Sequence, residues 1–482
     1  MKKYILEIIV FICGAVVMIY ELAGSRILAP YLGTSIFVWT SLIGVILGSL
    51  SLGYYLGGRL ADKQAKIETL DLIILATSLL ILFVYMIKEG LLGMTVATLG
   101  LKFGSIFAAL MLFAPASITM GMVSPYAARL KLNNLENSGR TIGNLYAIST
   151  LGSIVGTFMA GFVLIPKLGV DRIVLLLILI LLILSLVSSR QKRTIKIIFL
   201  VLTGLFFIFP ITNKNMVSID TSYNRVWLSS RQQGDRQILR LQTDPTSIQS
   251  QMFVDAPNEL AAEYTKYYDL AAYFKPDFQR TLIIGGCAYS YPKYFLEKYP
   301  DKDIDVVEID PAMTKIAREY FNLKDDENLK IIHEDGRIFL NKNQEKYDII
   351  LGDAFGSTLS IPYQLTTKEA VKAMSNSLSD DGLVVLNLIS AFEGKKSQFL
   401  QAEYKTFQSI FPKVLLYQVN NRDRETTQNI ILVALKQEDG SYANPDNFQS
   451  ILANEYKNRV ETNLPILTDN FAPVDNYLLK AI

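Results

Sequence analysis

Four turns rich in glycine or acid follow one another between residues 281 and 354, each directly after an apolar run. The first run ends in Gly285-Gly286 and the second delivers Glu308. The third is followed by Asp335-Gly336 and the fourth by Asp353. A single acid after a strand is often only a helix cap. Four such turns in order, where the carboxyl ends of parallel strands would meet, predict a ligand site.

These residue types suit the recognition of a nucleoside. Glycines let the backbone approach a ligand closely, and an acid at the end of the second strand can accept hydrogen bonds from a ribose diol. Asp335 before a glycine suits a contact to an adenine amino group. Asp353 lies where the reacting end of the nucleoside would reach. The third glycine of the usual dinucleotide pattern is absent.

Alternating strand and helix patterns must position these turns. Strands are predicted at Thr281–Gly285, Asp305–Ile309, Leu329–His333, Tyr347–Leu351, Gly382–Leu388, Lys413–Gln418 and Asn429–Leu435. Helices are expected around Pro292, from Pro311 and after Gly336. This alternation predicts a Rossmann-like α/β domain with a mostly parallel sheet.

A small β segment is expected before that domain. The stretches Asp220–Ser229 and Gln237–Thr243 alternate between apolar and polar residues, as strands of an antiparallel sheet do. A helical segment, Glu259–Phe274, leads from them to the α/β domain. We therefore divide this half of the 482-residue chain into residues 213–270 and 271–482.

Residues 1–212 read as a multi-pass α-helical membrane domain. Half of the whole chain is hydrophobic and its mean hydropathy is +0.28. Seven apolar stretches lie in this part, at Tyr4–Tyr20, Phe37–Leu56, Leu70–Met86, Ser105–Met122, Ile142–Ile165, Ile173–Val187 and Ile195–Ile211. Most approach the length of about 20 residues that a spanning helix needs, and the last two are short. Closely spaced glycines, such as Gly53 and Gly57, favour tight helix contacts in lipid.

The side of the membrane on which the α/β domain lies depends on the number of crossings. Basic clusters occupy alternate connections, which the positive-inside rule places in the cytoplasm. Seven crossings would then put the α/β domain outside, although nucleoside cofactors are made in the cytoplasm. We take Ile195–Ile211 as an interfacial or re-entrant segment. The predicted localisation is therefore the cell membrane, with a cytoplasmic C-terminal domain.

Composition limits the other classes of function. A net charge of +2 gives no sign of a nucleic-acid partner. The single histidine, His333, excludes metal sites that need several histidines, and we expect no metal. The two cysteines, Cys13 and Cys287, do not suggest a disulfide framework.

From about residue 218 to 435 the chain resembles the spermidine synthase family, the polyamine aminopropyltransferases. The shared runs are, in order, IIGG, VVEIDP, EDGRIFL, YDIILGDAF and IPYQLTTKEA. The first half resembles the membrane-fused members of the family through ELAGSRILAPYLGTSIFVWTSLIG and GMVSP. The resemblance implies a methyltransferase-like or spermidine-synthase-like fold and a transferase of polyamine biosynthesis.

The resemblance assigns most of the strand-end residues to a sulfonium nucleoside. Glu308 matches the acid that binds the ribose hydroxyls, beside the turn of Gly285 and Gly286. Asp335-Gly336 matches the adenine contact, and Pro362 matches a proline that lines the adenine side. The co-substrate would be decarboxylated S-adenosylmethionine or S-adenosylmethionine.

Other matches concern the reacting end of the site. Asp353 matches the catalytic base and Tyr264 the tyrosine beside the reacting amine. Gln249 matches a residue of the family's N-terminal segment, and Asn224 stands where a nucleoside-binding glutamine is usual. An amine is protonated at neutral pH, since its pKa is about 10.4, so a carboxylate such as Asp353 can accept its proton. The sulfonium is already a good leaving group, and the reaction requires no metal.

The sequence also departs from the family. Ala288 replaces the acid that holds the amine of the decarboxylated co-substrate, and Gly356 replaces a second acid. Thr265 stands where a histidine is usual after the tyrosine. Asp269 and Glu263 are acids that could compensate.

Several functions therefore stay open at this point. Aminopropyl transfer to a polyamine or other small amine acceptor is what the family implies. Methyl transfer or sulfonium cleavage with intact S-adenosylmethionine are alternatives. A further alternative is a non-catalytic nucleoside sensor on a transporter-like bundle. The expected partners are the lipid bilayer and a small-molecule acceptor, with a possible homo-oligomer, as in soluble family members.

Overall fold

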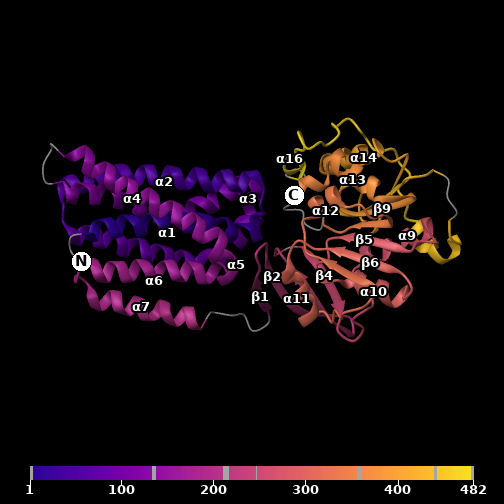
Figure 1. Ribbon diagram of the computed structural model, residues 1–482, viewed down its shortest axis with the longest axis horizontal. Helices are drawn as coiled ribbons and strands as arrows, with labels where there is room; N and C mark the ends of the chain where they lie inside the picture. The colour runs from indigo at the N-terminus through magenta and orange to yellow at the C-terminus, as the bar shows by residue number, and fades with distance from the viewer. Residues whose placement is uncertain are drawn as a thin grey trace. The chain divides into compact units, whose positions relative to one another are not determined.

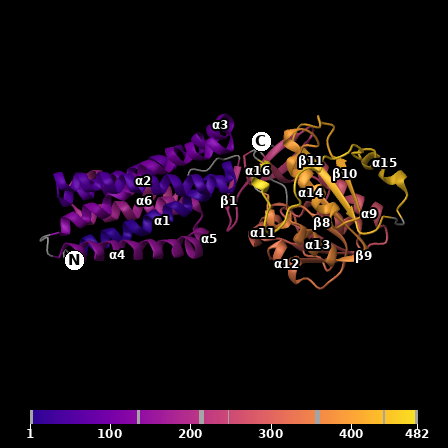
Figure 2. The same ribbon diagram turned by 90° about the horizontal axis from the view of Figure 1, so that it is seen from above.

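The computed structural model describes residues 4–132, 137–209, 216–245, 247–354, 361–438 and 442–478. The chain forms two units, Met1–Asn213 and Lys214–Ile482 (Figures 1 and 2). The first unit is built from helices, and the second combines two sheets with helices. The domain boundary expected at residue 212 lies outside the described residues.

Long helices that run along one another make up the first unit (Figure 1). They are α1 (Ile5–Leu32), α2 (Ile36–Lys63), α3 (Ile67–Lys131), α4 (Ser138–Met159), a π-helical turn (Ala160–Leu164), α5 (Ile165–Leu168), α6 (Val170–Ser188) and α7 (Arg193–Ile208). Gly100 has a non-helical conformation and interrupts α3. Two helical segments therefore share the label α3.

Six helical segments of this unit are long and apolar enough to cross a membrane, by length and composition. They are Ile5–Leu32, Ile36–Lys63, Ile67–Thr95, Thr98–Lys131, Ser138–Leu168 and Val170–Ser188. They correspond to the first six predicted apolar stretches. The seventh stretch forms α7, which has 16 residues and is not among the six.

Close helix contacts at glycines and a buried ion pair both contribute to the packing of the first unit. Small residues allow close approach, since a Cβ on Gly53 would lie 2.2 Å from the Ile118 carbonyl oxygen of α3. A buried ion pair joins α7 to α3, with 2.6 Å between Lys196 Nζ and Asp71 Oδ2. The Ser185 hydroxyl of α6 donates to the other oxygen of Asp71. The charges are thus paired and hydrogen-bonded, as buried charges must be.

The second unit begins with a four-stranded antiparallel sheet in the order β1-β2-β3-β4. Its strands are β1 (Met216–Asp220), β2 (Arg225–Gln233), β3 (Arg236–Gln242) and β4 (Ile248–Phe253). The prediction of one strand over Asp220–Ser229 was wrong, because a turn interrupts it. The Thr221 hydroxyl accepts a hydrogen bond from the Asn224 backbone and closes that turn.

The predicted helix Glu259–Phe274 is also broken. It consists of α8 (Glu263–Lys266), a 3-10 turn (Tyr267–Asp269) and α9 (Leu270–Phe274). The break is at a run of tyrosines and an aspartate, which have low helix propensity. Tyr268 and Asp269 are both buried there, so packing decides the local geometry.

A seven-stranded sheet follows, in the order β10-β11-β9-β8-β5-β6-β7. Its strands are β5 (Arg280–Ile284), β6 (Asp303–Val307), β7 (Leu329–Ile332), β8 (Tyr347–Gly352), β9 (Leu378–Ser390), β10 (Lys413–Gln418) and β11 (Gln428–Leu435). Strands β5 to β9 pair in parallel, whereas β11 pairs antiparallel with both β9 and β10. The predicted mostly parallel Rossmann-like sheet is therefore confirmed.

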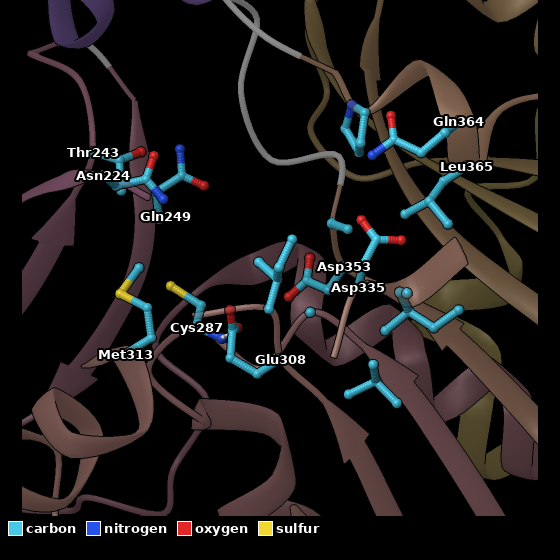
Figure 3. Close-up of a pocket in the computed structure, with 17 residues that line it drawn as sticks. Asn224, Thr243, Gln249, Cys287, Glu308, Met313, Asp335, Asp353, Gln364 and Leu365 are labelled. Atoms are coloured by element: carbon cyan, nitrogen blue, oxygen red, sulfur yellow. Dashed lines mark hydrogen bonds between the residues drawn. The ribbon is translucent and has the colours of Figure 1, made fainter. Parts of the chain in front are cut away.

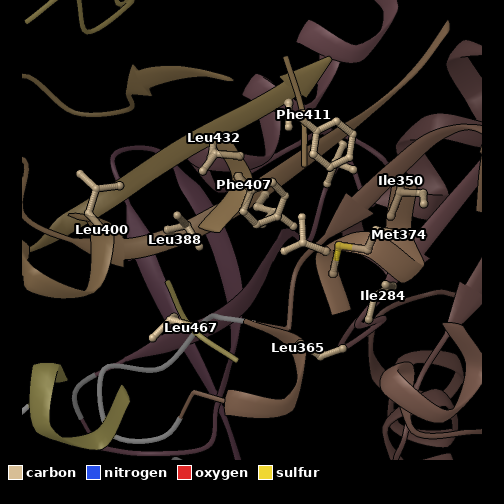
Figure 4. Close-up of a cluster of buried hydrophobic side chains, with 14 of the residues drawn as sticks. Ile284, Ile350, Leu365, Met374, Leu388, Leu400, Phe407, Phe411, Leu432 and Leu467 are labelled. Atoms are coloured by element: carbon tan, nitrogen blue, oxygen red, sulfur yellow. The ribbon is translucent and has the colours of Figure 1, made fainter. Parts of the chain in front are cut away.

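Helices cover the seven-stranded sheet, and apolar side chains fill the layers between them. The helices are α10 (Ser290–Lys298), α11 (Pro311–Tyr320), α12 (Gly336–Lys342), α13 (Lys368–Ser377), α14 (Gln398–Gln408), α15 (Gln449–Leu452) and α16 (Val474–Leu478). Short 3-10 turns lie at Tyr363–Leu365, Lys395–Ser397 and Pro445–Phe448. One core cluster joins Ile350 of β8 and Leu432 of β11 to Phe407 of α14 (Figure 4). This packing holds the strand ends, and the residues after them, in place.

Candidate functional site

The centre of the sheet is a topological switch point. Strand β5 lies between β8 and β6. The chain continues from β5 to β6 and β7 on one side of it, and then forms β8 and β9 on the other side. Ligands bind at such points, outside the carboxyl ends of the strands. Gly285 follows β5 with φ +100°, and a Cβ there would lie 2.9 Å from the Asp353 carbonyl carbon. A side chain at this position would thus be strained and would clash with the backbone after β8.

A cavity of about 240 Å³ opens at this edge of the sheet. Most of the predicted site residues line it, namely Asn224, Gln249, Gly285, Glu308, Asp335, Gly336, Asp353 and Pro362. Figure 3 shows Asn224 and Gln249 on one side of the cavity and Gln364 on the other, with the carboxylates between them. The small antiparallel sheet therefore supplies one wall, although it lies outside the seven-stranded sheet.

Glu308 is held rigidly at the floor of this cavity. One carboxylate oxygen accepts hydrogen bonds of 2.9 Å from the backbone N–H groups of Gly286 and Cys287. The other accepts one of 2.9 Å from the Asp310 N–H. Burial raises the pKa of Glu308, and these backbone hydrogen bonds act in the opposite direction. The carboxylate has remaining lone pairs for a ligand diol.

Asp335 has two roles at once. Its Oδ1 accepts from the N–H groups of Arg337 and Ile338, at 2.8 and 3.1 Å, and so caps α12. The residue also lines the cavity. Gly336 follows it, and a Cβ there would lie 2.6 Å from a methyl group of Ile284. The helix-cap reading and the binding-site reading of this turn are therefore compatible.

A second, smaller space of about 20 Å³ adjoins the cavity and shares Gly285, Cys287 and Asp353 with it. The two other predicted residues, Tyr264 and Gly286, line this space. Asp353 thus lies where the two spaces meet.

Asp353 is the titratable group with the most favourable position for chemistry. The Tyr264 hydroxyl donates to its Oδ2 at 3.2 Å. Burial raises the pKa of the Asp353 carboxyl to about 7, while the polar side chains of Tyr268, Tyr264 and Asn387 act in the opposite direction. A carboxylate with this pKa can accept a proton efficiently near neutral pH.

We next consider the two positions where the family has an acid and this chain does not, and the two acids that could compensate. Ala288 is fully buried in an apolar cluster with Val226 and Met313 and does not line the smaller space. Gly356 lies outside the described residues. Asp269 is buried behind the site, where it accepts from Tyr294 and Lys298 at 2.7 Å each. Glu263 pairs with a neighbouring lysine at the surface. Neither Asp269 nor Glu263 lines either space.

Sequence reasoning missed three residues of the smaller space or its margin. Tyr268 and Tyr291 line the space, with their rings perpendicular and 5.2 Å apart. Asn387 of β9 lies next to Asp353, and its Oδ1 accepts from Asn429 of β11 at 2.9 Å. Tyr268 could have been suspected from its spacing of four residues from Tyr264 on a helical segment. Asn387 is the one polar side chain within an otherwise apolar strand run, Leu383–Leu388, which was also a usable signal.

The fold and the cavity together define a doubly wound α/β domain with a cavity at its topological switch point. Residues 265–441 match the spermine/spermidine synthase domain. The C-terminal part of this chain is therefore similar to that domain family.

Two curated relatives and one solved structure are similar to this chain to different extents. A polyamine aminopropyltransferase of Vibrio vulnificus is 32% identical over 165 residues, which are 34% of this chain and 52% of the relative. Polyamine aminopropyltransferase 2 of Aquifex aeolicus is 22% identical over 407 residues, 79% of this chain and 78% of the relative. The matched 407 residues outnumber those of the second unit, Lys214–Ile482, so the similarity extends into the helical unit. A probable spermidine synthase from Corynebacterium glutamicum superposes with a TM-score of 0.40 and 21% identity, covering 48% of this chain and 82% of that one.

The matches to other relatives cover a smaller share of those proteins. The chain spans about half the length of the Vibrio vulnificus relative and 60% of a polyamine aminopropyltransferase from Streptococcus uberis, to which it is 31% identical.

Proposed function

We propose that this protein transfers the aminopropyl group of decarboxylated S-adenosylmethionine to an amine, and that helices anchor it in a membrane. The observation that carries the proposal is the position of Asp353. This carboxylate lies between a nucleoside-sized cavity and a smaller space, with a tyrosine hydroxyl donating to it. The names of the relatives, polyamine aminopropyltransferases, support the same reaction.

The charge of the cavity supports a cationic nucleoside. Three carboxylates line it, those of Glu308, Asp335 and Asp353, and no lysine or arginine does so among the described residues. Decarboxylated S-adenosylmethionine carries a sulfonium and an ammonium. Intact S-adenosylmethionine adds a carboxylate, which these acids would repel. The cavity therefore favours the decarboxylated co-substrate.

The chain's own side chains have distinct tasks in this reaction. Glu308 and Asp335 would orient the nucleoside through its ribose hydroxyls and adenine amino group. The amine nitrogen attacks the propyl carbon bonded to sulfur while the carbon–sulfur bond breaks. The bonding electrons move to sulfur and yield neutral methylthioadenosine. Asp353 accepts the proton that the amine loses, and the Tyr264 hydroxyl holds the carboxylate in position.

The proposed reaction can be tested with purified full-length protein in detergent. The protein is incubated with S-adenosylmethionine or its decarboxylated form, with and without amines, and the products are identified by mass spectrometry. Methylthioadenosine that forms only from the decarboxylated co-substrate with an amine is the expected result. Methylthioadenosine without an acceptor would indicate cleavage, S-adenosylhomocysteine would indicate methyl transfer, and no product would indicate a sensor.

We also propose that the catalytic unit faces the cytoplasm. Helix α7 has 16 residues, so at 1.5 Å per residue it is about 24 Å long, shorter than a hydrocarbon core of about 30 Å. Six crossings would place both ends of the first unit on the same side. All the basic clusters would then share that side, as the positive-inside rule requires.

Labelling of a single introduced cysteine tests this topology. Asn444→Cys, in a background without Cys13 and Cys287, should be protected from an impermeant maleimide in intact cells and labelled after lysis. Labelling in intact cells would show that α7 crosses and that the unit lies outside.

A further inference from the structure

The smaller space beside Asp353 has the chemistry to select the acceptor. It lies against the carboxylate that would take the acceptor's proton. Its walls carry hydroxyl groups and aromatic rings, contributed by Ser250, Tyr264, Thr265, Tyr268, Ser290 and Tyr291. At about 20 Å³ the space admits the amine end of an acceptor, next to Asp353.

Asp353 is the one carboxylate among the described residues that line this space. Residues 355–360, which follow it in the sequence, contain no acid. Glu308 and Asp335 line the nucleoside cavity, and each already accepts two or more backbone hydrogen bonds there. The aminopropyl ammonium of the co-substrate also needs a negative partner. Asp353 would thus already face the ammonium of the co-substrate before an acceptor brings a second positive charge.

A further buried acid, Asp269, is already paired with a lysine. Asp269 lies behind Tyr291, whose hydroxyl donates to it at 3.4 Å. The Lys298 ammonium lies 2.7 Å from the same carboxylate. Asp269 therefore holds the wall of the space in position and does not offer a free charge to an acceptor.

A further hydroxyl in the space belongs to Tyr268. Tyr268 is 1% exposed, and its hydroxyl makes no hydrogen bond of regular geometry to a described residue, although it lies near Asp353. This hydroxyl can also exchange a hydrogen bond with an uncharged ligand group that enters the space. The Tyr264 ring packs edge-on to that of Tyr268, with centroids 6.0 Å apart, and limits the room beside it.

We infer that the acceptor is a small monoamine, with one nitrogen that becomes charged and an uncharged remainder. This inference rests on the proposed aminopropyl transfer and narrows its acceptor. A diamine would bring a remote ammonium against the described walls next to this space, which offer no carboxylate besides Asp353, and burying an unpaired charge is unfavourable.

A panel of acceptors with the same chain length tests the inference. The wild-type protein is assayed with decarboxylated S-adenosylmethionine and butylamine, 4-aminobutan-1-ol or 1,4-diaminobutane, and methylthioadenosine is measured. Each monoamine should exceed the diamine in kcat/KM by about tenfold or more. A diamine that is used as well as or better than both monoamines would overturn the inference. Absence of product with every amine would instead contradict the proposed function.

A variant pair adds an independent test. Cys287 lines both spaces and has φ +46°, a conformation that Asp and Asn tolerate better than most residues. Cys287→Asp adds a carboxylate, and Cys287→Asn has the same shape without the charge. The diamine-to-monoamine ratio of kcat/KM should rise about tenfold in Cys287→Asp relative to Cys287→Asn. An unchanged ratio, with both variants folded by circular dichroism, would show that a missing charge does not set acceptor choice.

Discussion

Replacement of Asp353 by asparagine tests the central step of the proposed reaction. The variant keeps an oxygen that can accept from the Tyr264 hydroxyl, now at 3.2 Å from Oδ2, but it cannot take a proton from the amine. General-base catalysis contributes about 10²–10⁴-fold, or about 3–5 kcal/mol. We therefore expect kcat to fall by about that factor. Nucleoside affinity should stay within about threefold, because Glu308 and Asp335 are unchanged.

The pH dependence gives the same prediction a second readout. Since the pKa of Asp353 is about 7, wild-type kcat/KM should rise with pH up to about 7 and then level off. In Asp353→Asn this rise should disappear. The raised pKa also means that the charged carboxylate costs stability above pH 7, a cost that vanishes as the pH falls towards 4. Asp353→Asn should therefore melt at a higher temperature than wild type at pH 8, with a difference that shrinks on acidification.

The assay measures methylthioadenosine by chromatography, nucleoside affinity by calorimetry and melting by scanning calorimetry. Asp380→Asn, at an exposed position before the apolar core of β9, is the matched control. Near-normal turnover in Asp353→Asn with an unchanged pH profile would refute the role of Asp353. A loss of nucleoside binding equal to the loss of turnover would place the residue in binding and not in proton transfer.

Three other substitutions test neighbouring parts of the site. Glu308→Gln should weaken nucleoside binding about 10- to 100-fold, because it removes the charged acceptor, whereas the exposed Glu319→Gln should not; equal calorimetric affinities would contradict this. Gly285→Ala should lower the free energy of unfolding by about 3 kcal/mol and Gly234→Ala by about 1, since both have positive φ but only the former meets backbone atoms; similar urea midpoints would count against the close approach. Asn387→Leu removes a polar group that favours the charged form of the base, so the acidic limb of kcat/KM should move up by about one pH unit, and an unmoved limb would exclude this contact.

The order of the strand-end residues could be predicted from local pattern. Parallel strands bring their carboxyl ends to one edge, so the residues after β5, β6, β7 and β8 must gather there once the strands are recognised. Glu308, Asp335 and Asp353 accordingly line one cavity. The wall formed by Asn224 and Gln249 was expected only through the family resemblance. No local pattern shows where the small antiparallel sheet packs.

The sequence by itself determined the class of the α/β domain, the apolar character of the first half and the residues at the rim of the site. It did so because glycine turns, strand periodicity and helix length are local properties. The tertiary structure alone decided the environment of these residues. It placed Tyr268 and Asn387 beside Asp353, buried Ala288 among apolar side chains and paired Asp269 with Lys298. These outcomes depend on which distant segments pack together, and burial among them sets both the pKa of Asp353 and which carboxylates line the two spaces.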